Sequence, residues 1–378
     1  MLKSRLKAVV CILLAVLLSG CWNYTSLDQV NIIVGIAIDF DKEKNLYDLS
    51  YEAANLEGAS IDSSISGKII NSDGKTLFDA ARNAKRTEAD RLFFGSAQVL
   101  VISQQLAREA GMMSIIEWFL RDGECRETMC VAISQQETAS ELLESSEERS
   151  GIVSSTLHDI ISEDKDLTGT ALRVQLYQIY NALNSPRRSV AIPALRKVED
   201  DGDKIPEING MAVIKGNALA GFLSPKQSRY VLFVEEQMGS GILTLSMSDR
   251  PAHDVSLEIF WHKASKEYTY ENGKIDVSIK TDTQVAVAEN HTHMNMMDEH
   301  TIEKIEFTAA RMIERDIKDL ISELQHKYNA DIFGFGEMIY KKDLKLWDQL
   351  SPSWDEIYPT LDVDVTAKVR VINTGFIK

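Results

Sequence analysis

The strongest constraint on the fold is a run of apolar residues at helical spacing near the C-terminal end of the chain. Between Thr301 and Tyr328 they recur every three or four residues, which places them on one face of a helix. They are Ile302, Ile305, Ala309, Met312, Ile313, Ile317, Leu320, Ile321, Leu324 and Tyr328. Such a helix is about 40 Å long at 1.5 Å per residue. A face of that length needs a sheet to cover it, and the predicted last strand, 361–372, supplies part of one. We therefore expect core packing and not a partner-binding stripe.

Strands and helices alternate in the first half of the chain, which favours an α/β arrangement. The run 30–40, the polar turn 41–45 and the alternating segment 46–53 predict a β-hairpin. Further strands are predicted at 67–71, 97–102 and 128–133, and helices at 76–89, 104–120, 152–162 and 171–183, with an acidic helix beginning near Glu137. The predicted strand 189–198 contains Pro193, which assigns it to a sheet edge because proline cannot donate to a neighbouring strand.

The acidic run 199–204 is the clearest predicted linker. Its carboxylates could in principle hold calcium, but the run lacks the length and ligand spacing of a calcium loop. Beyond it we predict a hairpin of strands 209–214 and 219–223. A helix follows that Ser224 caps and Pro225 opens, and then strands at 241–247, 254–262 and 274–288.

These elements predict a mixed α/β fold in which helices pack on mixed sheets. A chain of 378 residues is too long for one core, which favours two or three domains. The expected division is a signal peptide at 1–20, an N-terminal α/β domain at 21–198, a middle domain at 199–248 and a C-terminal α+β domain at 249–378. The last domain is expected to hold an antiparallel sheet with the one long helix.

The first 20 residues have the three parts of an export signal. Lysine or arginine stands at positions 3, 5 and 7 with no acidic residue, 8–18 is apolar, and Ser19-Gly20 precedes Cys21. The apolar run is too short to cross a bilayer, which takes about 20 helical residues. A cysteine directly after the small pair is typical of a bacterial lipobox, so we predict cleavage before Cys21 and a diacylglyceryl group on its sulfur. Two acyl chains anchor a protein stably. The alternative is an ordinary secretory signal with a chance cysteine.

The chain is acidic, which limits its partners. Its net charge is −16, or −19 once residues 1–20 and their three positive charges are removed. Such a body is repelled by nucleic-acid phosphates and by anionic lipid headgroups. Nucleic acid is therefore not an expected partner. The lipid on Cys21, and not a basic patch, is expected to hold the protein at the membrane.

Cys125 and Cys130 remain after Cys11 leaves with the signal and Cys21 is modified. Their C-x4-C spacing has no companion histidine or cysteine cluster, which argues against a zinc site. Outside the cell they could form a disulfide. Two buried thiols are the favoured alternative, because the predicted strand aims Cys130 into a core.

The sequence contains no recognisable catalytic motif. A nucleophile elbow, a Walker loop and the dinucleotide-binding glycine pattern are all missing. Gly334-Phe335-Gly336 is a bare G-x-G that a turn after the long helix explains. His158-Asp159 and His253-Asp254 are sequence neighbours without a nucleophile, so they predict no catalytic triad. We therefore predict no enzyme, no catalytic residue and no cofactor.

One cluster contains ligand types that suit copper outside the cell. It comprises His291, His293, Met294, Met296 and Met297, with His300 nearby. The cluster lies in a connection between a strand and a helix, where polar residues are expected anyway. We therefore predict no physiological metal site there.

Short motifs along nearly the whole chain resemble one known family, the Ger(x)C C-subunit lipoproteins of bacterial spore nutrient-germinant receptors. Their order and spacing carry the resemblance more than any single motif does. The motifs are Cys21-Trp22, Val34-Gly35-Ile36-Ala37-Ile38-Asp39, Arg91-Leu92-Phe93-Phe94-Gly95, Leu106-Ala107-Arg108-Glu109-Ala110-Gly111, Phe119-Leu120-Arg121-Asp122, Tyr328-Asn329-Ala330-Asp331-Ile332-Phe333-Gly334-Phe335-Gly336, and Trp354 with the closing strand. Asn23 departs from the pattern, since an acidic residue is usual there, and the His/Met cluster is not part of it.

The resemblance implies a non-enzymatic, three-domain α/β lipoprotein on the outer face of the spore's inner membrane. It also implies two partners, a membrane-embedded A subunit and a transporter-like B subunit, which act with it in the response to nutrients. The alternative function is a lipid-anchored solute-binding protein of a transporter. Such proteins usually close two similar lobes on a ligand, which the predicted C-terminal part does not match. A cell-wall hydrolase is disfavoured because no nucleophile or metal set is recognisable.

Overall fold

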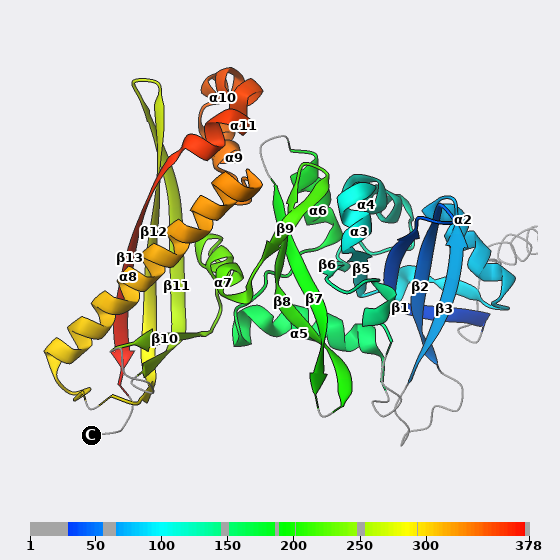
Figure 1. Cartoon of the computed structure of the whole chain (residues 1–378), viewed down its shortest axis with the longest axis horizontal. Coiled ribbons are helices and arrows are strands. Elements are labelled where there is room, and N and C mark those ends of the chain that lie inside the picture. The colour runs from blue at the N-terminus through cyan, green and yellow to red at the C-terminus, as the bar shows by residue number, and fades with distance from the viewer. Residues whose placement is uncertain are drawn as a thin grey trace, which may run out of the picture.

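The computed structural model describes residues 29–55, 66–144, 151–185, 189–200, 202–247, 254–292 and 294–374. Within these ranges the chain forms a nine-stranded and a four-stranded sheet, both mixed. The four-stranded sheet lies at one end of the long axis, and β1, β2, β3 and α2 lie at the other (Figure 1). The expectation of a mixed α/β protein with helices packed on mixed sheets is confirmed.

Every predicted strand is present in the predicted order, and β4 is an additional strand that the sequence did not predict. They are β1 (Val30–Asp41), β2 (Leu46–Asn55), β3 (Ser66–Gly74), β4 (Arg91–Phe93), β5 (Val99–Ser103), β6 (Cys130–Ser134), β7 (Val190–Asp200), β8 (Asp203–Lys215), β9 (Ala218–Leu223), β10 (Ile242–Ser246), β11 (Asp254–Glu271), β12 (Lys274–Asn290) and β13 (Asp362–Asn373).

The α-helices are α2 (Leu77–Asn83), α3 (Gln104–Glu109), α4 (Met112–Arg121), α5 (Val153–Leu167), α6 (Leu176–Leu183), α7 (Pro225–Val234), α8 (Glu299–Glu323), α9 (Phe335–Lys342), α10 (Leu344–Leu350) and α11 (Trp354–Ile357). Single turns of 3-10 helix are η2 (Ala84–Arg86), η3 (Phe94–Ser96), η4 (Ser140–Leu142), η6 (Ser351–Ser353) and η7 (Tyr358–Thr360), and η5 (Leu324–Tyr328) is a π-helical turn.

The nine-stranded sheet has the order β3-β2-β1-β5-β6-β7-β8-β9, with β4 paired to the first residues of β1. Strands β1, β5 and β6 run parallel, and their residues point alternately to two separate cores. Ile36 and Ile38 lie with α3, α4 and α6 on one face, whereas Ala37 packs with Leu157 and Ile161 of α5 on the other. A parallel sheet covered on both faces explains why these strands are apolar without interruption.

Several predicted helices are shorter than expected. The predicted helix 104–120 is two helices, α3 and α4, because Gly111 has φ 82°, a left-handed conformation that ends the first of them. Helix α2 gives way to η2 after Asn83, and α6 begins only at Leu176. Of the acidic helix expected near Glu137, the described residues form only η4, and residues 145–150 lie outside the described ranges.

Strand β7 is not an edge strand, contrary to the prediction from Pro193. It lies between β6 and β8, but it meets β6 only at Ala194 and Leu195, so the missing N–H of Pro193 faces no ladder bond there. The pairing with β8 shifts register between Pro193 and Leu195, as a β-bulge does.

The expected linker at 199–204 is also wrong. Glu199 pairs with Lys204 and Asp200 with Asp203, so this run closes the hairpin between β7 and β8. The polar composition that predicted a linker is equally suited to an exposed turn. The change from one sheet to the other falls after Leu223, and the sheets therefore do not follow the division at 21–198, 199–248 and 249–378. That three-domain division stays a prediction.

The four-stranded sheet has the order β10-β11-β12-β13. It is antiparallel from β10 to β12, as expected, but β13 runs parallel to β12. The physical reason is the connection: α8 carries the chain back along the sheet, so the next strand repeats the direction of β12. The long helix was correctly predicted, and Ile305, Ile313 and Ile317 on its apolar face are buried in the core over the sheet. The prediction of core packing for this face is thus confirmed.

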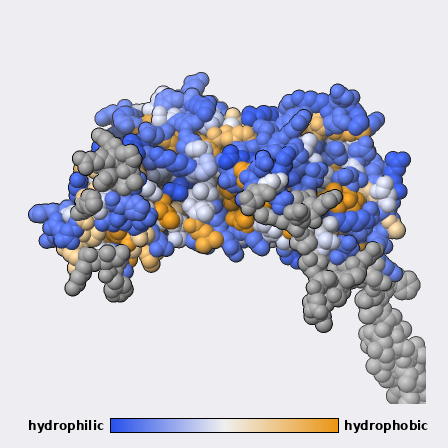
Figure 2. All heavy atoms as spheres, turned by 60° about the horizontal axis from the view of Figure 1, so that its bottom comes forward, coloured by the Kyte–Doolittle hydropathy of each residue, from blue (hydrophilic) through white to orange (hydrophobic). Residues whose placement is uncertain are grey.

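Figure 2 shows one face of the molecule as mostly hydrophilic, with hydrophobic residues gathered near the middle. The structure also contains a cavity of about 440 Å³ between α5, β8 and the start of α7, lined in part by Ile160, Leu167 and Ile208. Among the described residues, no helix has both the length and the apolar character to cross a bilayer.

Candidate functional site

Helix α7 occupies the junction between the two sheets (Figure 1). Ser224 caps it as predicted, since its hydroxyl accepts from the N–H of Gln227 and the Gln227 side chain accepts from the N–H of Ser224. Its residues 230–234 are all buried, because the helix has β8 and β9 on one side and α8 and β11 on another. Position and burial make α7 one of the elements that join the two sheets.

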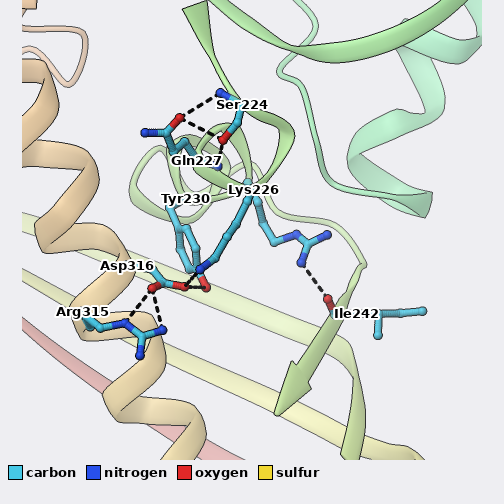
Figure 3. A network of polar contacts seen from close by, with 8 residues as sticks. Ser224, Lys226, Gln227, Tyr230, Ile242, Arg315 and Asp316 are labelled. Atoms are coloured by element: carbon cyan, nitrogen blue, oxygen red, sulfur yellow. Dashed lines mark hydrogen bonds and ion pairs between the residues drawn. The ribbon is translucent and has the colours of Figure 1, made fainter. Parts of the chain in front are cut away.

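A polar cluster fastens α7 to α8, with Asp316 at its centre (Figure 3). Tyr230 donates its hydroxyl to Asp316 at 2.9 Å, and the ammonium of Lys226 lies 3.0 Å from the same carboxylate. Arg315 donates from Nε at 2.9 Å and from Nη2 at 2.8 Å. Burial alone would favour the neutral acid, but the hydrogen bonds from Arg315, Lys226 and Tyr230 outweigh it, so the pKa of Asp316 is lowered. Asp316 is therefore an anion held by three donors.

The same cluster is unsuited to acid–base catalysis. Burial and the neighbouring Asp316 raise the pKa of Tyr230 well above its usual range, so the phenol stays protonated. Asp316 is only 7% exposed and is already paired on both oxygens. A catalytic carboxylate would need a lone pair directed at a substrate. The arrangement is therefore a clamp between helices.

A second fastening lies in the segment 328–336, which is one of the family motifs. Asp331 is buried, and its carboxylate accepts from the N–H of Phe335 at 2.9 Å and of Gly336 at 2.8 Å at the start of α9. Its carbonyl accepts from the N–H of Ser189, just before β7. Tyr358 donates to the carbonyl of Ala330 at 3.0 Å. This motif therefore shapes a turn and ties it to the nine-stranded sheet.

A cavity of about 380 Å³ opens at this junction, between α6 and β7 on one side and α7 and the 331–337 turn on the other. Its polar lining includes Arg173, Gln178, Glu235 and Glu337. Glu235 is paired with Lys266 of β11 at 2.8 Å. Among the described residues that line it, none is a histidine or a cysteine. The cavity offers charged and amide groups for binding, and Ser185 adds a hydroxyl.

A half-buried carboxylate, Asp39, and a buried one, Glu52, also hold the nine-stranded sheet to distant segments, through bonds that the sequence did not reveal. Asp39 in β1 accepts from the N–H of Ala139 and of Ser140 at 2.6 and 3.0 Å. Glu52 in β2 accepts from Val153 and Ser154 at the start of α5, at 2.7 and 2.6 Å. Burial raises the pKa of Asp39 and of Glu52 in spite of these bonds. Each bond joins segments far apart in the chain, so only the tertiary structure shows it.

Two further family motifs meet at the other end of the molecule. Arg91, Leu92 and Phe94 line a cavity of about 510 Å³ together with Trp118 and Asp122 at the end of α4. Helix α2 closes another side of it. The two motifs, 91–95 and 119–122, are more than 20 residues apart in the sequence, but in the fold they line the same cavity.

The predicted site residue Cys21 lies outside the described residues. So do His253 and His293, and with His293 part of the cluster that was considered for copper. His291 pairs with Glu289 at 2.7 Å, and the part of the chain that the structure describes contains no group of three His, Cys, Asp or Glu side chains that could hold a metal. Asp201, in the run considered for calcium, is likewise outside the described residues.

The two remaining cysteines are free thiols, as the favoured alternative predicted. Cys130 is fully buried in β6, and burial raises the pKa of Cys125 to about 12. Neither is a reactive nucleophile near neutral pH, because the thiolate is the reactive form.

Known proteins resemble this chain along almost its whole length. Residues 23–197 match the family described as spore germination protein N-terminal domain, and residues 209–375 match the one described as spore germination B3/GerAC like, C-terminal. Spore germination protein KC of Bacillus subtilis (strain 168) is 23% identical, over 99% of this chain and 97% of its own length. Spore germination protein B3 of the same organism is also 23% identical, over 99% of both chains. The crystal structure of the GerBC protein aligns with a TM-score of 0.58 at 20% identity, covering 90% of this chain and 97% of that one, so the two share a fold.

Proposed function

The chain belongs to the Ger(x)C family of spore germination proteins, and from this membership we propose that it is a lipid-anchored, non-enzymatic subunit of a germinant receptor. Its partners are the membrane-embedded A and B subunits of the same receptor. The anchor is a diacylglyceryl group on Cys21, and the protein lies on the outer face of the spore's inner membrane. Through this assembly it takes part in the response to nutrients.

The observation that carries the proposal is the match to both family domains in the expected order. Together they cover 23–197 and 209–375, and the first match begins just after Cys21. The motifs that suggested the family occupy structural positions, in β1, in the turn before α9 and around the cavity beside α2.

The geometry also favours assembly over catalysis. Glu52, Asp316 and Asp331 are buried carboxylates and Asp39 is half-buried, and each is engaged by N–H or O–H donors of the protein itself. A solute-binding protein that closes two similar lobes on its ligand is a poorer fit, since one sheet here has nine strands and the other four within the described residues.

The proposal is tested by purifying the tagged protein from spore membranes in mild detergent. Two multi-spanning membrane proteins are expected to co-purify in fixed proportion. The matched control is a Cys21→Ala variant made in the same cells, which should be recovered from the aqueous fraction. Recovery of the unaltered protein alone, at all detergent strengths that keep other membrane complexes intact, would contradict a receptor subunit.

The anchor has a separate test. Mass spectrometry of the N-terminal peptide should find the chain beginning at Cys21 with a diacylglyceryl thioether. An unmodified Cys21, with residues 1–20 still attached, would contradict the proposed lipid anchor.

A further inference from the structure

The chain after Cys21 enters the fold at β1, whose first residues pair with β4. Val30 lies opposite Arg91, Asn31 opposite Leu92 and Ile32 opposite Phe93. From residue 21 to residue 30 a fully extended chain reaches at most about 30 Å. A lipid on Cys21 therefore keeps the start of β1, and the surface around Arg91, within about 30 Å of the bilayer.

The segment 75–91, which forms α2, η2 and the start of β4, has an excess of basic residues, unlike the chain as a whole. Residues 75–91 carry five basic side chains and three acidic ones, in a chain of net charge −16. Arg82, Lys85, Arg86 and Arg91 are all exposed. Of the acids, Glu88 is paired with Lys68 at 2.7 Å. Glu124, three residues after the end of α4, forms an ion pair with Arg91.

Exposed aromatic rings accompany these cations. Phe78 of α2 is 54% exposed and Phe93 of β4 is 36% exposed. The guanidinium of Arg82 lies 4.8 Å from the centre of the Phe78 ring. Helix α2 turns Leu77 and Ala80 toward the core, so Phe78 is left on the outer side. Phe78, Arg82, Lys85 and Arg91 line the cavity of about 510 Å³, and Asp90, Asp122 and Glu124 line its other parts. We call the exposed side of α2 and η2 that borders this cavity, with Phe78, Arg82, Lys85 and Arg86, together with Arg91, the α2 face.

We propose that the α2 face rests on the anionic phospholipid headgroups of the membrane that holds the anchor. This inference rests on the proposed function, since the tether begins at Cys21. Cations with aromatic rings between them are the combination by which helices lie at a membrane interface. The attraction to anionic lipid falls off within a Debye length, about 8 Å, so only a surface that the tether brings close can use it.

The consequence is an upright orientation. The α2 face and the four-stranded sheet lie at opposite ends of the long axis (Figure 1). With α2 on the headgroups, the four-stranded sheet and α8 point away from the bilayer. The acidic remainder of the protein is then kept away from the anionic bilayer surface, which would repel it. The lipid on Cys21 holds the protein at the membrane, and the α2 face sets its orientation there.

The test places a fluorescent thiol probe at Phe78→Cys or at Phe307→Cys in the full, lipidated protein reconstituted into vesicles. Both positions are exposed phenylalanines on helices, and Phe307 on α8 is 68% exposed, so it is the matched control. The native thiols react slowly at pH 7, because burial raises the pKa of both Cys125 and Cys130. Protein without an introduced cysteine serves as the control for background labelling of the native cysteines.

In vesicles that contain phosphatidylglycerol and a headgroup nitroxide, quenching at position 78 is expected to exceed that at position 307 at least threefold. Equal quenching at both positions would overturn the proposal. Quenching at 78 that appeared only when the two membrane subunits were added would instead assign the α2 face to a protein.

Charge reversal supplies a second measurement. Arg82→Glu with Lys85→Glu should lower the quenching of a probe at position 78 severalfold, since each cation near an anionic surface changes local occupancy about fivefold. The control pair is Lys304→Glu with Arg311→Glu on α8, both exposed, which should leave it unchanged. If both pairs had the same effect, the α2 face would have no special role. Intact mass on each sample reports the lipid on Cys21 separately, so loss of the anchor is distinguished from loss of the orientation.

Discussion

Tyr230 on α7 and Asp316 on α8 are joined by a hydrogen bond of 2.9 Å between two buried side chains. One side of α7 packs on β8 and β9 of the nine-stranded sheet, and α8 covers the four-stranded sheet. The bond therefore fastens the two halves of the molecule to each other. Lys226 and Arg315, whose side chains are more exposed, form ion pairs with the same carboxylate (Figure 3).

Replacing Asp316 by Asn should lower the free energy of unfolding at pH 7 by about 1–2 kcal/mol. Hydrogen bonds to a charged group are worth more than neutral ones, but Lys226 and Arg315 are 66% and 62% exposed, and solvent screens their share. Denaturant unfolding followed by circular dichroism measures the change. Asp319→Asn on the exposed side of α8 is the matched control and should be neutral.

The cost of Asp316→Asn should shrink as the pH falls. The pKa of Asp316 in the folded protein is below the ordinary value of 3.8, so its stabilisation is fully present above that value. It is lost as the pH falls through the lowered pKa, where the folded carboxylate takes up its proton. Unfolding at pH 7, 5 and 3 should therefore give converging stabilities for the two proteins. A gap that widened toward pH 3 would contradict this account.

Glu52→Gln should weaken the junction between β2 and α5. The carboxylate accepts from the N–H of Val153 and of Ser154, whereas an amide can accept on only one atom, so a loss of about 1–2 kcal/mol is expected. Glu163→Gln, on the exposed side of α5, provides the comparison. Hydrogen exchange should show faster opening at the start of α5 in the first variant and not in the second.

The pH dependence of Glu52 has the opposite sign from that of Asp316. Burial raises its pKa above the ordinary 4.5, so the folded protein binds a proton at a pH where the unfolded chain does not. This group therefore adds stability as the pH falls through the raised pKa toward 4.5. Glu52→Gln should lack that component, and the stability difference between the two proteins should grow across this window.

Gly35→Ala should destabilise the protein by about 1–3 kcal/mol, the usual cost of overpacking a core. A Cβ at position 35 would lie 2.4 Å from the Cβ of Ser154, because α5 crosses β1 at this glycine. Gly123→Ala is the control, since a Cβ there meets no atom within 4 Å. Equal thermal midpoints for the two variants would refute the close approach of α5.

Thiol counting tests the cysteines and the anchor together. Burial raises the pKa of Cys125 to about 12, and Cys130 is completely buried. Both thiols of the native protein should therefore react slowly with a disulfide reagent at pH 7. After denaturation the mature protein should show the thiols of Cys125 and Cys130. An additional thiol would mean that Cys21 is unmodified, and absence of reaction would mean a disulfide.

The fold was predictable wherever a local pattern dominates. The helical period of α8 and the Ser224-Pro225 start of α7 predicted their elements, because capping and amphipathicity act within a few residues. The errors occurred where the outcome depends on distant partners. Pro193 lies in an interior strand because β6 pairs with β7 only beyond it, and the direction of β13 depends on α8.

The candidate sites were less predictable than the fold. Asp39 ends one of the family motifs and Glu52 belongs to none, but the sequence predicted the bonds of neither, since the N–H groups that they bind are about a hundred residues away. The cavity that the α2 face borders joins β4, α2 and the end of α4, which only the sheet order brings together. The basic residues of 75–91 were visible in the sequence, but their significance depends on the position of β1.

The position of β1 also has a mechanical consequence. The strand pairs with β2 along one side, between Ile33 and Asp41. Along the other side it pairs with β4 at residues 30–32 and with β5 at residues 35–38. A pull on the chain ahead of Val30 runs along the strand and loads these ladders in shear, many bonds at once. A force applied perpendicular to the strand would instead break these hydrogen bonds one after another. Tension at the N-terminus is thus carried by the paired strands of the nine-stranded sheet.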